Sequence, residues 1–466
     1  MMLALAIALA IVVQDHTPLR SGAQSGAVEL TTLWQGDVLE VRGERAGYVQ
    51  VYNYRRERGG YLRSDAVRPL GLTEHDAPEL LAVLRFLRET RGSEALGISY
   101  GAAYLKAVPP QSLTAEPLEA IARMAERLAD AASGTAHSAV DVGAHLDVAS
   151  QFGIHMRSFE HNGHIQVCYD GELFQRVLVL PQASAEERAL AALSLTRPDC
   201  IDPAIGAAAR LALDRERSSV LDGIAERELT ALMRSRLHAR RAAVWASLAF
   251  EGVRNGAPPT AAGQRALTEL LGVRATDLGE DLKLEYTDAE VRVSASRWAA
   301  AAPAQRLVGF TLSTAPGDPG QTCVALRSSP QGVAPLVQRC TYGIPWMASA
   351  QAIAQGEAVV LAVQPLESWR ELWIFHRRAG SWVVDVLPPG TDDPEEGYIE
   401  YAGYVPATRR LLIACELKNR GHFRRVFEEL RLDDLEIVRL ASSPELLRDF
   451  GRWQDVQWRR DTLALR

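Results

Sequence analysis

The pentapeptide Gly97-Ile98-Ser99-Tyr100-Gly101 matches the pattern G-x-S-x-G, which in many hydrolases carries a nucleophilic serine. That role requires a buried strand that delivers the serine to a sharp turn before a helix. The preceding residues 91–96 read Arg-Gly-Ser-Glu-Ala-Leu, which is a poor sequence for a buried strand. We therefore expect a helix that begins at Ser99, and we expect that a change of Ser99 to alanine leaves any activity intact.

Two clusters could bind a metal ion. His155, His161 and His164 surround a predicted turn, with His145 nearby, and histidines across a hairpin could ligate zinc. No histidine precedes a glutamate, so the zinc motif H-E-x-x-H is absent. An acidic loop could hold calcium, but its spacing is not that of an EF-hand; it contains Asp392, Asp393, Glu395 and Glu396. We predict solvated side chains in both places, no metal site and no cofactor.

Arginine supplies nearly all of the positive charge. The chain of 466 residues has 51 basic and 58 acidic residues and a formal net charge of -7, and only three of the basic residues are lysine. No Gly-Lys dipeptide and no Ser-x-x-Lys exist, which excludes a P-loop and the serine nucleophile of penicillin-binding proteins. The mild acidity argues against a nucleic-acid partner. One basic stretch follows Glu226 and Glu228, so pairing within a helix is expected; it contains Arg234, Arg236, Arg240 and Arg241.

The five cysteines are candidates for disulfide bonds. None forms C-x-x-C, so a zinc ribbon or a thioredoxin-like motif is not indicated. In an oxidising compartment the pairs that lie near each other in the sequence are Cys168 with Cys200 and Cys323 with Cys340. Each would close a short loop, worth about 3 kcal/mol. Cys415 lies in an apolar run and is predicted to be a buried thiol.

The first thirteen residues form an apolar run. Such a run is shorter than the roughly 20 residues that span a bilayer, but it fits the apolar part of a secretory signal peptide. We predict a signal peptide over residues 1–14, a periplasmic or secreted protein, and no integral membrane span after signal removal. No basic residue precedes the run and the cleavage site is vague. The alternatives are a buried first strand, as in an intracellular protein, or a misplaced start codon.

Residues 15–70 contain short β-rich runs separated by turn residues, a pattern that favours a small β-barrel. The pattern is carried by Leu19-Arg20, Leu33-Trp34-Gln35-Gly36-Asp37-Val38-Leu39-Glu40-Val41, Gly47-Tyr48-Val49-Gln50-Val51 and Gly59-Gly60-Tyr61-Leu62. It resembles a bacterial Src-homology-3-like (SH3b-type) domain, with tyrosine at 48 and 61 where that family commonly has tryptophan. The resemblance implies a module that binds peptides or cell-wall material.

The strand around residues 48–54 presents two different faces. Tyr48, Tyr52 and Tyr54 share one phase of the alternation, whereas Val49 and Val51 share the other. The valines are expected in the core, and the tyrosines are the predicted ligand-binding residues, because an aromatic face can dock a peptide or a glycan. The alternative is that the tyrosines only cap this small core.

Residues 71–282 have helical periodicity and are predicted to form a mainly helical domain. A β patch near 152–181 interrupts it. Asn162-Gly163 and Asp170-Gly171 are strong hairpin signals, so we expect a three-stranded meander. Its strands would be Ile154 to Phe159, Ile165 to Tyr169 and Phe174 to Leu180.

Residues 283–466 contain seven of the nine tryptophans and a weak repeat. Strand-like runs start at 307, 359, 411 and 463, and an aromatic residue precedes each run. This arrangement resembles β-propeller blades of the TolB or WD type, although propellers close with at least about four blades. An incomplete propeller, an open stack, a sandwich or an unrelated all-β domain remain open, and Leu282 to Tyr286 and Val291 to Ser294 are possible extra strands.

The sequence as a whole predicts a multidomain α+β protein. Its order is an SH3-like barrel, a mainly helical domain and a C-terminal antiparallel β domain with propeller-like repeats. The favoured function is a non-catalytic binding or scaffold protein of the bacterial cell envelope, with an envelope protein or a peptidoglycan fragment as partner. The alternative is a cell-wall peptide or glycan hydrolase. Cys168 with His155 or His164 is its sole cysteine–histidine candidate, which a disulfide bond would disable.

Overall fold

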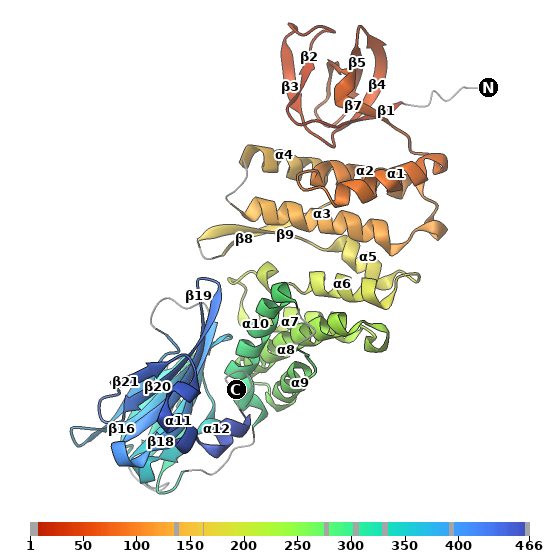
Figure 1. Cartoon of the computed structure of the whole chain (residues 1–466). Helices are drawn as coiled ribbons and strands as arrows, with labels where there is room; N and C mark the ends of the chain where they lie inside the picture. Colours follow the sequence, from red (N-terminus) through yellow and green to blue (C-terminus); the bar gives the residue numbers. More distant parts are fainter. Residues whose placement is uncertain are drawn as a thin grey trace. The chain divides into compact units, whose positions relative to one another are not determined.

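The computed structural model describes residues 8–134, 139–161, 163–274, 279–301, 307–328, 334–390 and 396–461 (Figure 1). The chain folds as two compact units, which comprise Met1–Ala204 and Ile205–Arg466. The fold is mixed α+β: an antiparallel sheet, then helices, then further sheets. The segment 71–282, predicted as one helical domain, contributes helices to both units.

Unit 1 begins with a seven-stranded antiparallel sheet in the order β3-β2-β6-β5-β4-β1-β7. The strands are β1 (Leu9–Val12), β2 (Thr17–Arg20), β3 (Glu29–Leu33), β4 (Val38–Arg45), β5 (Tyr48–Asn53), β6 (Arg58–Arg63) and β7 (Val67–Leu70). Alternation along each strand turns one set of side chains inward. Leu19, Leu33, Leu39, Val51 and Leu62 are each at most 1% exposed and form the core.

Strand β1 lies in the segment predicted as a signal peptide. It pairs antiparallel with both β4 and β7, and Ala10, Ile11 and Val12 are at most 2% exposed. Residues 1–7 lie outside the described part of the chain. Cleavage after residue 14 would remove this strand from between β4 and the edge strand β7. The signal peptide stays a prediction, and the two interpretations differ in the N-terminus that they expect for the folded protein.

Helices follow the sheet in unit 1. They are α1 (Ala77–Arg88), α2 (Glu94–Ala107), α3 (Ala115–Ser133), α4 (Ala139–Ser150), α5 (Glu172–Val179) and α6 (Ala185–Leu195). Their core includes Leu84, Leu118, Ile121 and Met124, all at most 2% exposed. A two-stranded antiparallel hairpin, β8 (Met156–His161) with β9 (His164–Tyr169), packs beside α3.

The third strand of the predicted meander is wrong, because residues 172–179 form α5. Gly171 takes a left-handed conformation with φ 87°, and Asp170 Oδ1 accepts the backbone N–H of Glu172 at 3.1 Å, which starts a helix. Leu173, Phe174 and Val177 are buried while Gln175 and Arg176 are exposed. This helical spacing buries one stripe against α3, so the turn signal at 170–171 ends a strand but does not begin another.

Unit 2 begins with four helices: α7 (Ala207–Asp222), α8 (Ala231–Arg254), α9 (Thr260–Leu271) and α10 (Glu280–Ser296). The possible strands at 282–286 and 291–294 are wrong, since both segments lie within α10. Ala289 and Val293, four residues apart, pack against α8 residues such as Ala242 and Ala246. Their spacing of four matches a helix rather than the alternation of a strand.

Two sheets complete unit 2, one of three strands and one of nine. A three-stranded sheet has the order β10 (Thr311–Pro316), β11 (Thr322–Arg327), β12 (Val337–Thr341). A nine-stranded sheet contains β13 (Ile344–Pro345), β14 (Gln351–Ile353), β15 (Ala358–Leu366), β16 (Trp369–Arg378), β17 (Ser381–Leu387), β18 (Glu396–Val405), β19 (Arg410–Asn419), β20 (His422–Arg431) and β21 (Ile437–Ala441). Two short helices follow, α11 (Arg448–Trp453) and α12 (Val456–Asp461).

The segment in which the predicted runs start 52 residues apart contains two local meanders. β14-β15-β16-β17 pair in chain order, and so do β18-β19-β20-β21. The two meanders join through parallel pairing of Trp369 with Gly397 and Arg370 with Tyr398. Neither sheet is closed in the described residues. The run predicted at 463 lies outside those residues.

Candidate functional site

Ser99 lies in the interior of α2, which starts at Glu94, five residues before the predicted start. Its side chain is 1% exposed, and its Oγ donates to the carbonyl oxygens of Ala95 and Gly36, both at 2.9 Å. The flanking glycines allow α2 to approach α3: a Cβ on Gly97 would lie 2.4 Å from Met124 Sδ, and one on Gly101 would lie 2.4 Å from Ile121 Cγ1. The motif packs helices rather than exposing a nucleophile.

We expect Gly101→Ala to lower the free energy of unfolding by about 1–3 kcal/mol, because the added methyl overpacks the α2–α3 contact. Urea unfolding followed by circular dichroism measures this. The matched control is Gly143→Ala in α4, where an added Cβ has nothing within 4 Å. That change should stabilise by about 0.5–1 kcal/mol through helix propensity. Equal stability of Gly101→Ala and the wild type would contradict a packing role.

The four predicted disulfide cysteines lie at bonding distance in the predicted pairs. Cys168 and Cys200 have their sulfur atoms 2.12 Å apart, and Cys323 and Cys340 are direct cross-strand partners of β11 and β12. Cys415 is buried in β19 with a free thiol, and burial raises its pKa. Cys168 is therefore bonded to Cys200 and is not available as a thiolate next to a histidine.

The histidine cluster does not converge on a common point. His161 and His164 are cross-strand partners at the hairpin end with ring centroids 6.2 Å apart, and Asn162 between them lies outside the described residues. No group of three or more potential metal-ligating side chains occurs in the described part of the chain. Of the acidic loop, residues 392–395 lie outside it, and Glu396 begins β18 and pairs with Arg292 at 2.8 Å.

His145 belongs to another cluster, which connects the sheet of unit 1 to α4. His145 Nε2 lies 2.8 Å from Asp15 Oδ1, and the side chain of Gln35 donates to Asp15 Oδ2 at 2.9 Å. Burial raises the pKa of Asp15, but the bonds from His145 and Gln35 outweigh it and hold the pKa below its usual value. The sequence analysis grouped His145 with the histidines of the hairpin. Its partner is instead Asp15, in a loop 130 residues earlier in the chain.

The basic stretch of α8 faces the interior of unit 2. Arg240 and Arg241 are 8% and 2% exposed, and they pair with Glu285 and Glu226. Glu226 lies in a separate turn before α8, so this pairing is tertiary rather than within one helix. Side chains that are buried and paired do not offer a surface to nucleic acid.

The predicted tyrosine face is present, but its three tyrosines differ in exposure to solvent. Val49 and Val51 are 4% and 1% exposed, as alternation requires, while Tyr48 and Tyr52 are half-buried and Tyr54 is 62% exposed just beyond β5. The rings of Tyr52 and Tyr54 meet edge to face at 5.0 Å. Tyr48 takes no part in this ring contact, because it lies at the opposite end of β5.

Two charged groups hold the tyrosine pair in place. The guanidinium of Arg42 lies 4.1 Å from the ring centroid of Tyr52, and the hydroxyl of Tyr54 donates to Glu40 Oε2 at 2.8 Å. Arg42 also donates to Glu40 at 2.9 Å. The hydrogen bonds from Arg42 and Tyr54 lower the pKa of Glu40, and the bond to Glu40 raises the pKa of Tyr54. Tyr54 therefore stays a neutral donor, and its ring has a fixed direction.

Tyr54 also lines an open groove of about 460 Å³ in unit 1. The groove lies between the sheet and the end of α4, and its lining consists of Val38, Asn53, Tyr54, Arg55, Ser150 and Gln151. Arg55 is oriented by Asp147, whose carbonyl oxygen accepts from Arg55 Nη1 at 2.5 Å. The site combines an aromatic ring, a guanidinium and amide groups, which suits a ligand with both apolar and polar parts. The contribution of α4 had no signal in the sequence.

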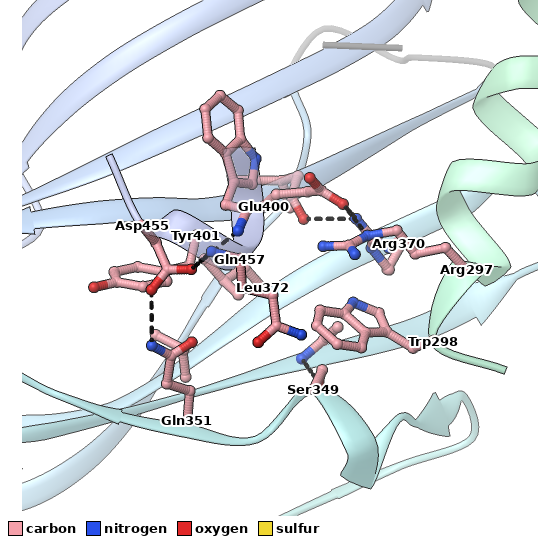
Figure 2. A pocket seen from close by; sticks show the side chains of 14 residues that line it. Arg297, Trp298, Ser349, Gln351, Arg370, Leu372, Glu400, Tyr401, Asp455 and Gln457 are labelled. Carbon is pink, nitrogen blue, oxygen red and sulfur yellow. Dashed lines mark hydrogen bonds and ion pairs between the residues drawn. The ribbon is translucent and has the colours of Figure 1, made fainter. Parts of the chain in front are cut away.

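Unit 2 contains a second, more enclosed pocket, which the sequence did not indicate (Figure 2). It lies between the segment that follows α10, the strands β15, β16 and β18, and α12. Arg297 and Arg370 meet Glu400 inside it, and Asp455 meets Gln351. The residues come from positions 297 to 458, so only the fold brings them together.

Comparisons of the chain with protein-family models, with curated proteins and with solved structures find no match. None of the helices in the described part of the chain is long and apolar enough to cross a membrane.

Proposed function

We propose that this chain is an exported, non-catalytic binding protein of the bacterial cell envelope that holds a peptide or cell-wall fragment in the groove beside Tyr54. The observation that carries the proposal is this groove, in which an exposed, oriented tyrosine lies next to an oriented arginine. The SH3b-type pattern of the sequence supports the same assignment. Aromatic rings supply contact area at low entropic cost, and arginine pairs with the carboxylates of wall peptides.

The proposed export is supported by the cysteine pairs. Two pairs at disulfide distance are compatible with a periplasmic or extracellular location, because such bonds persist in oxidising compartments. The bond between Cys168 and Cys200 weakens the alternative of a cysteine peptidase, since it leaves Cys168 without a free thiol. The propeller-like module remains part of the proposal: two meanders of four strands each are compatible with blades.

We expect Tyr54→Ala to weaken binding to purified peptidoglycan fragments by about tenfold or more, the usual effect of removing an aromatic anchor. Tyr54→Phe should retain most of the affinity, because the ring remains. Tyr342→Ala is the matched control, since Tyr342 is 66% exposed and belongs to unit 2. Co-sedimentation with purified sacculi and titration with soluble wall peptides measure the affinities.

Two results would refute the proposal. One is a wild-type chain that binds neither sacculi nor soluble fragments. The other is a loss of binding in Tyr342→Ala equal to that in Tyr54→Ala, which would place the ligand elsewhere. Release of a cleaved product from sacculi would instead support the hydrolase alternative.

A further inference from the structure

The two disulfide bonds differ in their exposure to solvent. Cys168 is 1% exposed in β9, and Cys200 is half-buried in a turn that begins at Pro198. The sulfur of Cys168 lies 4.0 Å from the carbonyl oxygen of Asp199, so the same turn covers it. Cys340, in contrast, is exposed in β12, and its partner Cys323 is 5% exposed. Of the two bonds, Cys323–Cys340 is therefore the one that ends in an exposed cysteine.

Alternation along the strands places this bond on the outer face of the three-stranded sheet. Val324 and Leu326 of β11 belong to the core that contains Trp373. Cys323 is one residue before Val324, so Cys323 and its direct cross-strand partner Cys340 point away from that core. The bond therefore lies on the face of the sheet that the core around Trp373 does not cover.

Strand β12 lies at the edge of this sheet. Within the described residues it forms a ladder with β11 alone. On its inner face Val337 packs against the core, and the guanidinium carbon of Arg339 lies 5.4 Å from the ring centroid of Trp373, which is 2% exposed. The disulfide joins residues 17 positions apart and ties β12 to its neighbour. Without this bond, the ladder and the packing of the inner face would have to hold β12 over Trp373.

We propose that the Cys323–Cys340 bond is a site of thiol–disulfide exchange with an external dithiol, and that its reduction loosens β12. A thiolate must reach one sulfur of the bond, and the exposed Cys340 gives it access in the folded protein. The thiolate attacks Cys340 Sγ, the bond to Cys323 breaks, and Cys323 leaves as a thiolate.

The second thiol of the reductant completes the exchange. It displaces Cys340 from the mixed disulfide, so the dithiol becomes a disulfide and the chain gains two thiols. The two cysteines take up the two protons that the dithiol releases. This site lies in unit 2 and does not involve the groove of unit 1, so its test is independent of the proposed function.

The first test is partial reduction of the folded full chain with dithiothreitol. Free thiols are alkylated at successive times, and mass spectrometry of a digest gives the reduced fraction of each pair. We expect Cys323–Cys340 to be reduced at least about tenfold faster than Cys168–Cys200, because access limits the rate. In concentrated guanidinium chloride the two rates should converge. A protein dithiol of the C-x-x-C type replaces dithiothreitol in a second series, which distinguishes a protein reductant from a small one.

Two results would overturn the exchange site. One is that neither reductant reduces Cys323–Cys340 before Cys168–Cys200 in the folded chain. The other is a difference in rate that persists undiminished in the denaturant, because access in the folded state would then not be its cause.

The second test is hydrogen exchange of the backbone amides of β12. We expect reduction to speed exchange in Val337–Thr341 by at least about tenfold, since the closed loop no longer restricts the opened strand. The double variant Cys323→Ser with Cys340→Ser should have the same effect without a reductant. If it does not fold, the partially reduced wild type gives the measurement.

The matched control is the double variant Cys168→Ser with Cys200→Ser, which removes the bond of unit 1. It should leave hydrogen exchange in β12 unchanged. Unchanged exchange of β12 in the reduced wild type would overturn the loosening of this strand. Equal changes in the two double variants would overturn its assignment to the Cys323–Cys340 bond.

Discussion

A chain that starts at Asp15 is expected to lose the folded sheet of unit 1. Such a chain lacks β1, which pairs with β4 on one side and β7 on the other. Ile11 and Val12 are both 0% exposed. Each buried side chain of this size contributes about 1.5–3 kcal/mol. With the lost strand pairing the total loss exceeds about 5 kcal/mol, which is comparable with the whole stability of a typical domain.

Urea unfolding of the chain without residues 1–14 measures the effect. The control is a chain without residues 1–7, which keeps β1 and should unfold near the wild-type midpoint. Mass spectrometry of the protein after export decides between the two interpretations of the N-terminus. A chain in which β1 belongs to the folded protein retains Leu9–Val12, and both disulfide bonds are expected in a non-reducing digest. A mature N-terminus at residue 15 with undiminished stability would instead establish the predicted signal peptide.

The second large effect is expected for Glu400→Gln in unit 2. Glu400 is 3% exposed and is the carboxylate partner of Arg297 and Arg370, the latter 0% exposed. Burial and the nearby Arg297 lower the pKa of Arg370, while Glu400 raises it. Removal of the negative charge leaves two buried guanidinium groups without their carboxylate. Breaking a buried pair in this way costs about 3–5 kcal/mol.

The matched control is Glu357→Gln, which breaks an exposed pair in the same unit. Glu357 and Arg409 have side chains that are 51% and 45% exposed, and a pair of this kind contributes about 0–1 kcal/mol. Urea unfolding of both variants at one pH measures the difference. Similar losses in Glu400→Gln and Glu357→Gln would show that the buried cluster does not stabilise unit 2.

Local patterns in the sequence predicted the structure well where that structure depends on a single strand or a single turn. The alternation of Val49 and Val51 with tyrosine was confirmed, because side chains on a strand must point to opposite faces. The hairpin signal at residues 162–163 also lies between two paired strands. The strand predicted at residues 174–180 was wrong, because a short apolar run fits both a strand and a helix. Packing against α3 favours the helix here.

Sequence motifs that resemble a catalytic turn or a strand did not predict the structure correctly at two places. The glycines around Ser99 look like a catalytic turn, but their small size serves the contact between two helices. The segment 282–294 looked strand-like because valine and tyrosine favour strands, yet tertiary contacts of α10 with α8 overrode this preference. A local pattern cannot reveal a partner that lies far away in the chain.

The sequence alone predicted the α+β composition, the pairing of cysteines that lie near each other in the chain and the alternation of tyrosine with valine along β5, because each depends on residues close together in the chain. The tertiary structure decided which of those tyrosines lines a groove, since α4 completes it. It also decided the cluster of Arg297, Arg370 and Glu400. Their charges meet across about 100 residues, and the pairing arises only when α10 and the sheet share one core.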